Sequence, residues 1–335
     1  MVQTSTATSI IGNSLPMWRL KSYMRKVAMT ESHVLITGET GSGKELAAQY
    51  MHQHSARRGK PLIPINCTAL PDGLLESELF GYEKGAFTGA VSSYPGKLKL
   101  AQGGTVLFDE IGDMSPYAQA KILRVIETKE VYPLGGRRSV PLDIRIVAAT
   151  NRDVERQVSK NQFRQDLYFR LNVARVHLPP LRERRDDIPL LIDHFVEEFS
   201  ARLGRRIEGF SNEAMELILR YKWPGNIREL MNLIERVFID PPREKIGIVD
   251  LPESMRSSQP TRQETVPAER DVLLYTLSQT NWNKSKAAER LHWSRMTLYR
   301  KIAKYHIVES QSEAAQSPSE PVDNRNNFTV TVTKV

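Results

Sequence analysis

The stretch HVLITGETGSGKE, residues 33–45, decides the fold of this chain. Its first five residues predict a buried strand, and a helical pattern follows at 44–54. The spacing G-x-x-x-x-G-K between them is that of a phosphate-binding loop, whose backbone N–H groups turn toward phosphate oxygens while a lysine neutralises their charge. The strand–loop–helix order disfavours an ordinary glycine-rich turn. The predicted nucleotide ligands are Gly38, Glu39, Thr40, Gly41, Ser42, Gly43, Lys44 and Glu45.

A second apolar run, residues 104–109, ends in two carboxylates. Asp109 is placed to hold Mg²⁺, directly or through water. Glu110 can orient and deprotonate an attacking water. This metal role matters because Glu45 stands where most phosphate-binding loops have a Ser or Thr ligand for the ion. A solvated turn is the alternative, but the preceding phosphate-binding loop favours a nucleotide triphosphatase.

Three further groups of polar residues narrow the class. Thr150 and Asn151 follow a predicted strand and can sense the γ-phosphate, although such a pair is commonly only a turn. Arg164 and Arg170 can stabilise phosphoryl charge across a subunit interface, although spacing alone favours pairing with Asp166 or solvent. Arg228 begins a predicted helix and can report on the nucleotide.

The order of elements predicts an α/β fold with a parallel sheet. Apolar runs at 33–37, 61–66, 104–109 and 144–149 alternate with helical stretches such as 44–54 and 117–128. We expect an α/β core at 10–186, a helical lid at 187–240, a linker with five prolines at 240–267 and a helical module at 268–306. Residues 307–335 are rich in Ser, Gln, Glu, Pro and Asn, which is typical of disorder, and their end at 328–332 has a strand-like pattern.

One hexapeptide carries a resemblance to a known family. GAFTGA, residues 85–90, follows ESELFG at 76–81. With the motifs above, residues 10–239 closely resemble the AAA+ domain of bacterial enhancer-binding proteins, the NtrC-like activators of sigma-54 RNA polymerase. The resemblance implies an AAA+ P-loop NTPase fold with a helical lid.

The resemblance also implies roles for individual residues. The family has a glutamate at the position of Glu45, Asp109 and Glu110 match its Walker B pair, and Asn66 matches an asparagine that couples the catalytic glutamate to the nucleotide. Thr150 and Asn151 match sensor I, Arg164 and Arg170 the arginine fingers, and Arg228 sensor II. ATP and Mg²⁺ are the implied cofactors, and a hexameric ring with ATP between subunits is the implied assembly. The implied contact with sigma-54 is a mobile glycine-flanked loop made of Gly85, Ala86, Phe87, Thr88, Gly89 and Ala90. Sequence alone leaves open whether Phe87 is a contact or a core residue.

The segment 281–304 reads as a helix–turn–helix. Ala287, Ala288 and Leu291 form the inner face of its first helix, and Ser294 can cap the second. The pattern resembles the Fis-like DNA-binding module of the same family, although its turn has Leu-His-Trp where Leu-Gly-Ile is common. A basic helical hairpin packed on the core is the alternative. The predicted DNA-binding residues are Lys284, Lys286, Ser294, Arg295, Met296, Thr297, Tyr299, Arg300 and Lys301. A helix at about 268–279 can pair two modules on a roughly palindromic enhancer site.

Composition fits this prediction. The 335 residues carry 47 Lys and Arg against 39 Asp and Glu, a net charge of +8, and residues 281–305 alone hold seven basic residues against one acidic. The basic excess is therefore concentrated where DNA would bind. A lone cysteine, Cys67, excludes a disulfide framework, and no apolar run suits a membrane helix or signal peptide, so we expect a cytoplasmic protein.

The leading hypothesis is an ATP-driven activator of sigma-54 polymerase. A chaperone, helicase or clamp loader would lack GAFTGA and the terminal helix–turn–helix. A DNA-binding repressor with a decayed ATPase would not retain Lys44, Asp109 and Glu110. Because the AAA+ match begins within the first dozen residues, we expect no receiver domain and control in trans by a separate inhibitor or partner protein.

Overall fold

The computed structural model describes residues 10–68, 71–240, 245–256, 273, 276–277, 279–280, 282–291, 293–305 and 307. The chain divides into two compact units after Gln259, and each is described by itself. No helix within these described ranges combines the length and apolarity that crossing a membrane requires.

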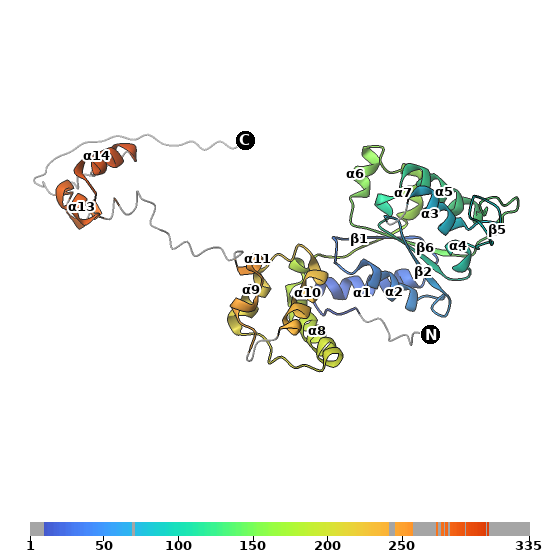
Figure 1. Ribbon diagram of the computed structural model, residues 1–335, viewed down its shortest axis with the longest axis horizontal. Helices are drawn as coiled ribbons and strands as arrows, with labels where there is room; N and C mark the ends of the chain where they lie inside the picture. The colour runs from blue at the N-terminus through green and yellow to red at the C-terminus, as the bar shows by residue number, and fades with distance from the viewer. Residues whose placement is uncertain are drawn as a thin grey trace, which may run out of the picture. The chain divides into compact units, whose positions relative to one another are not determined.

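A parallel five-stranded sheet forms the centre of the first unit (Figure 1). Its strand order is β2-β3-β6-β1-β7, with neighbouring strands in parallel register. The strands are β1 (Val34–Thr37), β2 (Leu62–Asn66), β3 (Thr105–Asp109), β6 (Arg145–Thr150) and β7 (Ala174–His177). The four strands predicted from apolar runs are confirmed to within a residue at each end. The edge strand β7 was not predicted, because its ARVH sequence alternates apolar and polar residues instead of forming an apolar run.

Helices cover both faces of the sheet (Figure 1). Helices α1 (Leu15–Ala28) and α2 (Lys44–Gln53) pack on the face to which Val34 and Ile36 point. The opposite face, which receives Leu35 and Phe108, is covered by α3 (Asp72–Phe80), α4 (Lys97–Leu100), α5 (Pro116–Thr128), α6 (Val154–Ser159) and α7 (Gln165–Leu171). A small antiparallel pair, β4 (Glu130–Val131) and β5 (Val140–Pro141), extends beyond α5. Three 3₁₀ turns complete the core: η1 (Ile111–Asp113), η2 (Leu181–Glu183) and η3 (Arg185–Asp187).

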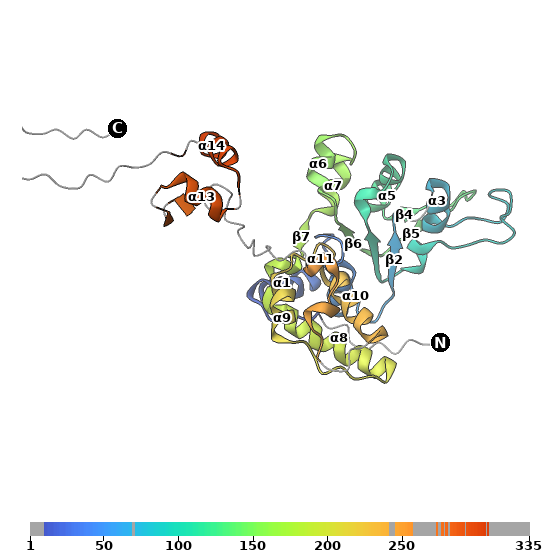
Figure 2. The same cartoon turned by 60° about the vertical axis from the view of Figure 1, so that its left-hand side comes forward.

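The helical lid follows the sheet along the chain (Figure 2). Its buried residues form a hydrophobic core of their own. It contains α8 (Ile188–Leu203), α9 (Asn212–Arg220), α10 (Asn226–Ile239), η4 (Ile248–Asp250) and α11 (Glu253–Arg256). Trp223 is fully buried between α9 and α10 and donates its indole N–H to the Ile218 carbonyl at 2.9 Å.

Part of the expected linker at 241–267 belongs to this lid. Ile246, Leu251 and Met255 are buried in the lid core, so the prediction of a linker across that whole range was wrong. Prolines in the segment suggested a loop, yet its apolar residues have the spacing needed to cover α9.

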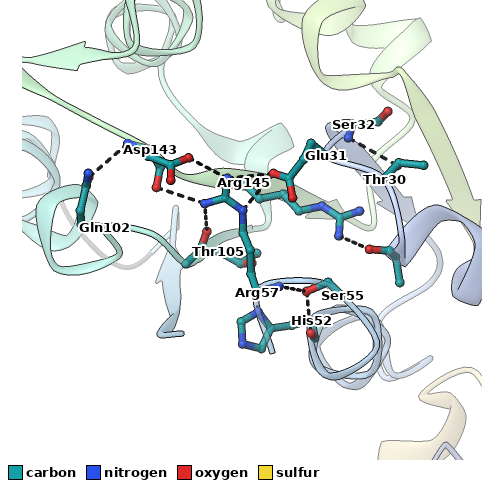
Figure 3. Close-up of polar contacts among 12 residues, drawn as sticks. Thr30, Glu31, Ser32, His52, Ser55, Arg57, Gln102, Thr105, Asp143 and Arg145 are labelled. Carbon is teal, nitrogen blue, oxygen red and sulfur yellow. Dashed lines mark hydrogen bonds and ion pairs between the residues drawn. The ribbon is translucent and has the colours of Figure 1, made fainter. Parts of the chain in front are cut away.

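A polar network ties the ends of several elements together at the edge where the strands begin (Figure 3). Arg57 lies between Glu31 and Asp143, with N–O distances of 2.8 and 2.7 Å. Arg145 is only 2% exposed and donates to the carbonyls of Val27 and Ala28 at 2.8 and 2.9 Å. These carbonyls lie at the C-terminal end of α1, where no later helical N–H reaches them; Arg145 donates to both, and the Val27 carbonyl also accepts from the Thr30 N–H and hydroxyl at 3.1 and 2.9 Å.

The second unit contains the expected helix–turn–helix. Its helices are α13 (Lys284–Arg290) and α14 (Arg295–Lys304). Ala287, Ala288 and Leu298 are buried between them together with Leu277, and Leu291 packs at the margin. The expected helix at 268–279 lies partly outside the described residues, as does the tail with its strand-like pattern at 328–332.

Candidate functional site

The loop 38–43 joins β1 to α2. Gly41 and Gly43 have φ of 74° and 100°, values that favour glycine. Gly43 is the N-cap of α2 and offers no side chain to the first-turn N–H groups, which leaves them open to an anion. Lys44 is 7% exposed and donates to the Gly38 carbonyl at 3.2 Å, so its ammonium lies over the loop.

The two carboxylates at the end of β3 face the same loop. Glu110 Oε1 lies 3.2 Å from Lys44 Nζ, and Glu110 Oε2 accepts the Asn151 backbone N–H at 2.9 Å. Burial, and next the Glu110 charge, raise the pKa of Asp109 above its ordinary value. A crowded carboxylate pair of this kind fits a divalent cation, since the ion would relieve the repulsion.

A cavity of about 230 Å³ lies between these groups and the lid. Its lining combines residues of the loop, the β3 end and α10: Thr40, Gly41, Gly43, Lys44, Glu45, Leu46, Asp109, Glu110, Ile227, Arg228 and Met231. The structure thus brings together the predicted Lys44, Asp109, Glu110 and Arg228 around a space with the charges that a phosphate chain and its metal require.

The other predicted sensing residues lie around this cavity in different ways. Asn151 Nδ2 donates to Thr40 Oγ1 at 2.8 Å, which joins the end of β6 to the loop. Thr150 is buried, and its hydroxyl accepts from the Arg152 N–H at 3.0 Å. Asn66 ends β2 beside Asp109, with its Oδ1 accepting from Thr68 and not from a group near Glu110.

Arg164 and Arg170 lie at the two ends of α7. Arg164 forms a bidentate pair with Asp166, with N–O distances of 3.0 and 2.7 Å, and holds the pKa of that carboxyl below its ordinary value. Arg170 lies 3.4 Å from Glu127. Both side chains are about half exposed, and neither lines the phosphate cavity of its own chain.

A second cavity, of about 250 Å³, adjoins the loop and was not predicted. It is lined mainly by apolar residues of the chain start, α1, α2 and the lid, among them Ile10, Ile11, Leu46, Leu178, Phe195 and Ile227. Two buried polar atoms in its wall, Ser42 Oγ and Arg184 Nε, have no hydrogen-bond partner within the described chain. An apolar slot with a few unsatisfied polar groups next to a phosphate site suits a flat heterocyclic base. Its walls come from segments far apart in sequence, so no local pattern in the sequence indicated it.

The GAFTGA loop is exposed. Gly85 and Gly89 have φ of 84° and 103°, and Phe87 is 46% exposed with its ring 5.0 Å from that of Tyr82. This answers the question that the sequence left open, since Phe87 is not a core residue. Of the six residues predicted to contact sigma-54, Ala90 is the buried one, at 7% exposed, and its N–H donates to the Phe87 carbonyl at 3.0 Å.

In the helix–turn–helix, α14 carries the predicted basic face. Ser294 accepts from the Thr297 N–H at 3.1 Å and caps the helix as expected. Arg295, Met296, Tyr299 and Arg300 are exposed. Lys284 and Lys301 stack on the rings of Tyr299 and Trp293, with centroid distances of 5.4 and 4.9 Å. Thr297 is half-buried, and Lys286 is exposed near the start of α13.

Fold and site define an AAA+ P-loop ATPase with a helical lid, coupled to a small DNA-binding module. Three family models match in chain order: a sigma-54 interaction domain at residues 10–177, an AAA+ ATPase lid domain at 182–268 and a bacterial regulatory protein of the Fis family at 266–305. The chain belongs to the sigma-54-dependent transcriptional activators, which are enhancer-binding ATPases.

Individual relatives agree with this assignment. The transcriptional regulatory protein ZraR of Escherichia coli is 44% identical over 307 residues, which cover 90% of this chain and 70% of that relative. The regulatory protein AtoC of the same organism is 42% identical over 312 residues, 89% of this chain and 68% of AtoC. Among solved structures, NtrX from Brucella abortus in complex with ATP has a TM-score of 0.70 and 31% identity, covering 89% of this chain and 70% of NtrX.

Proposed function

We propose that this chain hydrolyses ATP at the shared edge of an oligomeric ring, and that the stroke of its GAFTGA loop converts a sigma-54 polymerase closed complex into an open one. The observation that carries this proposal is one chain holding both an assembled phosphate site and an exposed, glycine-flanked Phe87. The structure of the similar NtrX in complex with ATP supports the nucleotide.

In this proposal ATP spans the two cavities. The adenine enters the apolar slot, where Ser42 Oγ and Arg184 Nε supply the unsatisfied polar atoms. The phosphates lie on the N–H groups of the loop and on Lys44, and Arg228 reaches them from α10. Asp109 is the residue best placed to hold Mg²⁺, which would neutralise charge on the phosphates.

Hydrolysis needs a water held in line with the γ-phosphate. Glu110 is the proposed base, and binding of the phosphates to Lys44 would free its carboxylate from the 3.2 Å ion pair. Asn151 lies between Glu110 and Thr40 and can report the γ-phosphate to both. We assign Asn66 to holding Glu110 in one nucleotide state, Thr150 to supporting Asn151, and Arg164 and Arg170 to the nucleotide of the adjacent subunit.

The loop 85–90 is the proposed output element. Its glycines permit two positions, and an exposed aromatic residue is a suitable anchor on a protein partner. The exposed face of α14 is proposed to enter the major groove of enhancer DNA, with two modules pairing on a two-fold site and a hexameric ring as the active form.

The variant Phe87→Ala tests the coupling. Because Phe87 is not among the residues that line the phosphate cavity, we expect ATPase activity within about twofold of wild type. Binding of sigma-54 with an ATP transition-state analogue bound should fall at least about tenfold. The matched control, Tyr23→Ala, removes an exposed aromatic residue of α1 that lines neither cavity and should leave sigma-54 binding unchanged. Unaltered binding by Phe87→Ala would refute the assignment of the loop.

A further inference from the structure

Glu39, the second residue of the phosphate-binding loop, points away from the phosphate cavity and toward the lid. Its carboxylate receives two hydrogen bonds from one guanidinium: Arg182 Nη1 donates to Oε2 at 2.8 Å and Nη2 donates to Oε1 at 2.6 Å. This parallel geometry is the strongest arrangement for an arginine–carboxylate pair. Arg182 lowers the pKa of Glu39 to about 2, so the carboxylate stays charged.

A third side chain completes the group from the lid. Asn226 is fully buried, with φ of 52°, and its Nδ2 donates both to Glu39 Oε2 at 3.1 Å and to the Thr40 carbonyl at 3.0 Å. Its Oδ1 accepts the Leu181 N–H at 2.8 Å. One amide therefore links the phosphate-binding loop, the segment before the lid, and the first residue of α10.

The backbone of residues 225–227 also contacts the backbone of the phosphate-binding loop directly. Ile227 donates its N–H to the Gly41 carbonyl at 3.0 Å. A Cβ at Gly41 would lie 2.2 Å from the Gly225 carbonyl oxygen, which no side chain tolerates. Residues 225–227 are thus seated on the loop in one register, and Arg228, which lines the phosphate cavity, follows directly.

We propose that Glu39, Arg182 and Asn226 form a latch that seats the lid on the phosphate-binding loop and sets the position of Arg228. Arg182 has a second effect in this latch, because it neutralises a carboxylate carried by the loop that forms the proposed phosphate site. All three are positioning residues and need not touch ATP. The inference rests on the proposed role of the cavity as the ATP site.

The charge effect makes the latch testable by a double-mutant cycle. Arg182→Gln leaves Glu39 as an uncompensated negative charge on the loop that would bind the triphosphate, so ATP binding should weaken about 5- to 10-fold. Glu39→Gln removes that charge and keeps the side-chain shape, so Glu39→Gln/Arg182→Gln should recover affinity to within about threefold of wild type.

Binding of a fluorescent ATP analogue to the full chain, at low and high salt, measures the cycle. The loss in Arg182→Gln should shrink as salt rises, because the repulsion is partly screened. If the double variant binds as weakly as Arg182→Gln, Arg182 holds phosphate itself and the charge-neutralising role is overturned. If the wild-type chain does not bind the ATP analogue at all, that result contradicts the proposed ATP site itself, whereas the outcomes above test the latch.

Asn226→Asp tests the positioning role. Aspartate tolerates positive φ and can still accept from Leu181, but it loses both donated bonds and faces Glu39 with a second charge. We expect kcat to fall about tenfold with a smaller change in KM, and Asn226→Asp/Arg228→Ala to be no slower than Arg228→Ala. Additive losses would overturn the proposal. The thermal midpoint of each nucleotide-free variant checks folding, and the matched control Asn232→Asp, on the same helix outside the latch, should keep wild-type kcat.

Discussion

At the scale of single residues, the proposed catalytic base Glu110 is positioned by an ion pair with Lys44 that bound nucleotide would break. Lys44 and Glu110 lie 3.2 Å apart, and Glu110 has φ of 54°, a conformation that non-glycine residues seldom adopt. The Asn151 N–H holds the other carboxylate oxygen. The proposed base is thus fixed in direction by two partners, one of which is also the proposed phosphate ligand.

Glu110→Ala should separate ATP binding from hydrolysis. Removing the carboxylate deletes the proposed base but leaves the loop and Lys44, so ATP affinity should stay within about threefold while turnover falls at least about 100-fold. Equilibrium binding and phosphate release on the same preparation measure both. Unchanged turnover would exclude Glu110 as the base.

Motif residues were predictable from sequence, whereas their distant partners were not. Lys44, Asp109, Glu110 and Arg228 were found because each stands at a fixed offset from a strand or a helix start. The Glu39–Arg182 pair joins residues 143 positions apart, and no local pattern encodes that contact.

At the scale of elements, the pattern of apolar residues predicted most of the sheet and its covering helices. Where the structure differs from that prediction, the difference has a physical cause. Apolar runs revealed the buried strands β1, β3 and β6 and the partly buried edge strand β2, but the other edge strand, β7, is buried on alternate residues only. The lid extends beyond Ile239 because Ile246, Leu251 and Met255 cover α9 despite nearby prolines. Tertiary burial outweighed local loop signals there.

Arg145 is expected to contribute strongly to stability through α1. Arg145→Met keeps the apolar bulk but removes the donor to the buried Ala28 carbonyl and one of the donors to Val27, whose carbonyl keeps Thr30, so it should cost about 1–3 kcal/mol of unfolding free energy. Denaturant unfolding measures this loss. The exposed Arg156→Met should change the same quantity by less than about 0.5 kcal/mol, and equal effects of the two variants would contradict the capping role.

The contact between lid and loop should weaken in acid. The folded pKa of Glu39, about 2, lies below the ordinary value of 4.5, so its stabilising effect is complete above the ordinary value and is lost as pH falls toward 2. Glu39→Gln has no such group, so the difference in thermal midpoint between wild type and Glu39→Gln should shrink as pH is lowered from about 5 toward 2. A difference that stays constant over this range would contradict the Glu39–Arg182 pairing.

At the scale of the whole molecule, the arginines of α7 point to a site shared between subunits. Arg164 and Arg170 are half exposed and lie outside the phosphate cavity of their own chain. Under the proposed role, these arginines would act on the nucleotide of a neighbouring subunit, and activity would depend on assembly. The order of the ATPase core, lid and helix–turn–helix was predictable because each has its own motif. The second, apolar cavity could not be predicted, because residues 10 and 11, the phosphate-binding loop and the lid together form its walls.

Mixing two inactive variants tests this sharing. Arg170→Ala keeps Glu110, and Glu110→Gln keeps Arg170, so each should be inactive alone. An equal mixture should recover about a quarter of wild-type ATPase activity, since half the sites hold Glu110 and half of these meet an intact arginine. Arg175→Ala, which removes an exposed arginine on β7, should remain active alone. A mixture without recovered activity would place Arg170 outside a shared site.

The most direct test of the central claim is promoter opening by sigma-54 polymerase on supercoiled DNA, followed by the reactivity of unpaired thymines. We predict that the wild-type chain opens the promoter with ATP but not with a non-hydrolysable analogue, and that Phe87→Ala fails with either although it hydrolyses ATP. Opening by the wild-type chain without hydrolysis, or by Phe87→Ala at the wild-type rate, would contradict the coupling of ATP hydrolysis to the GAFTGA loop.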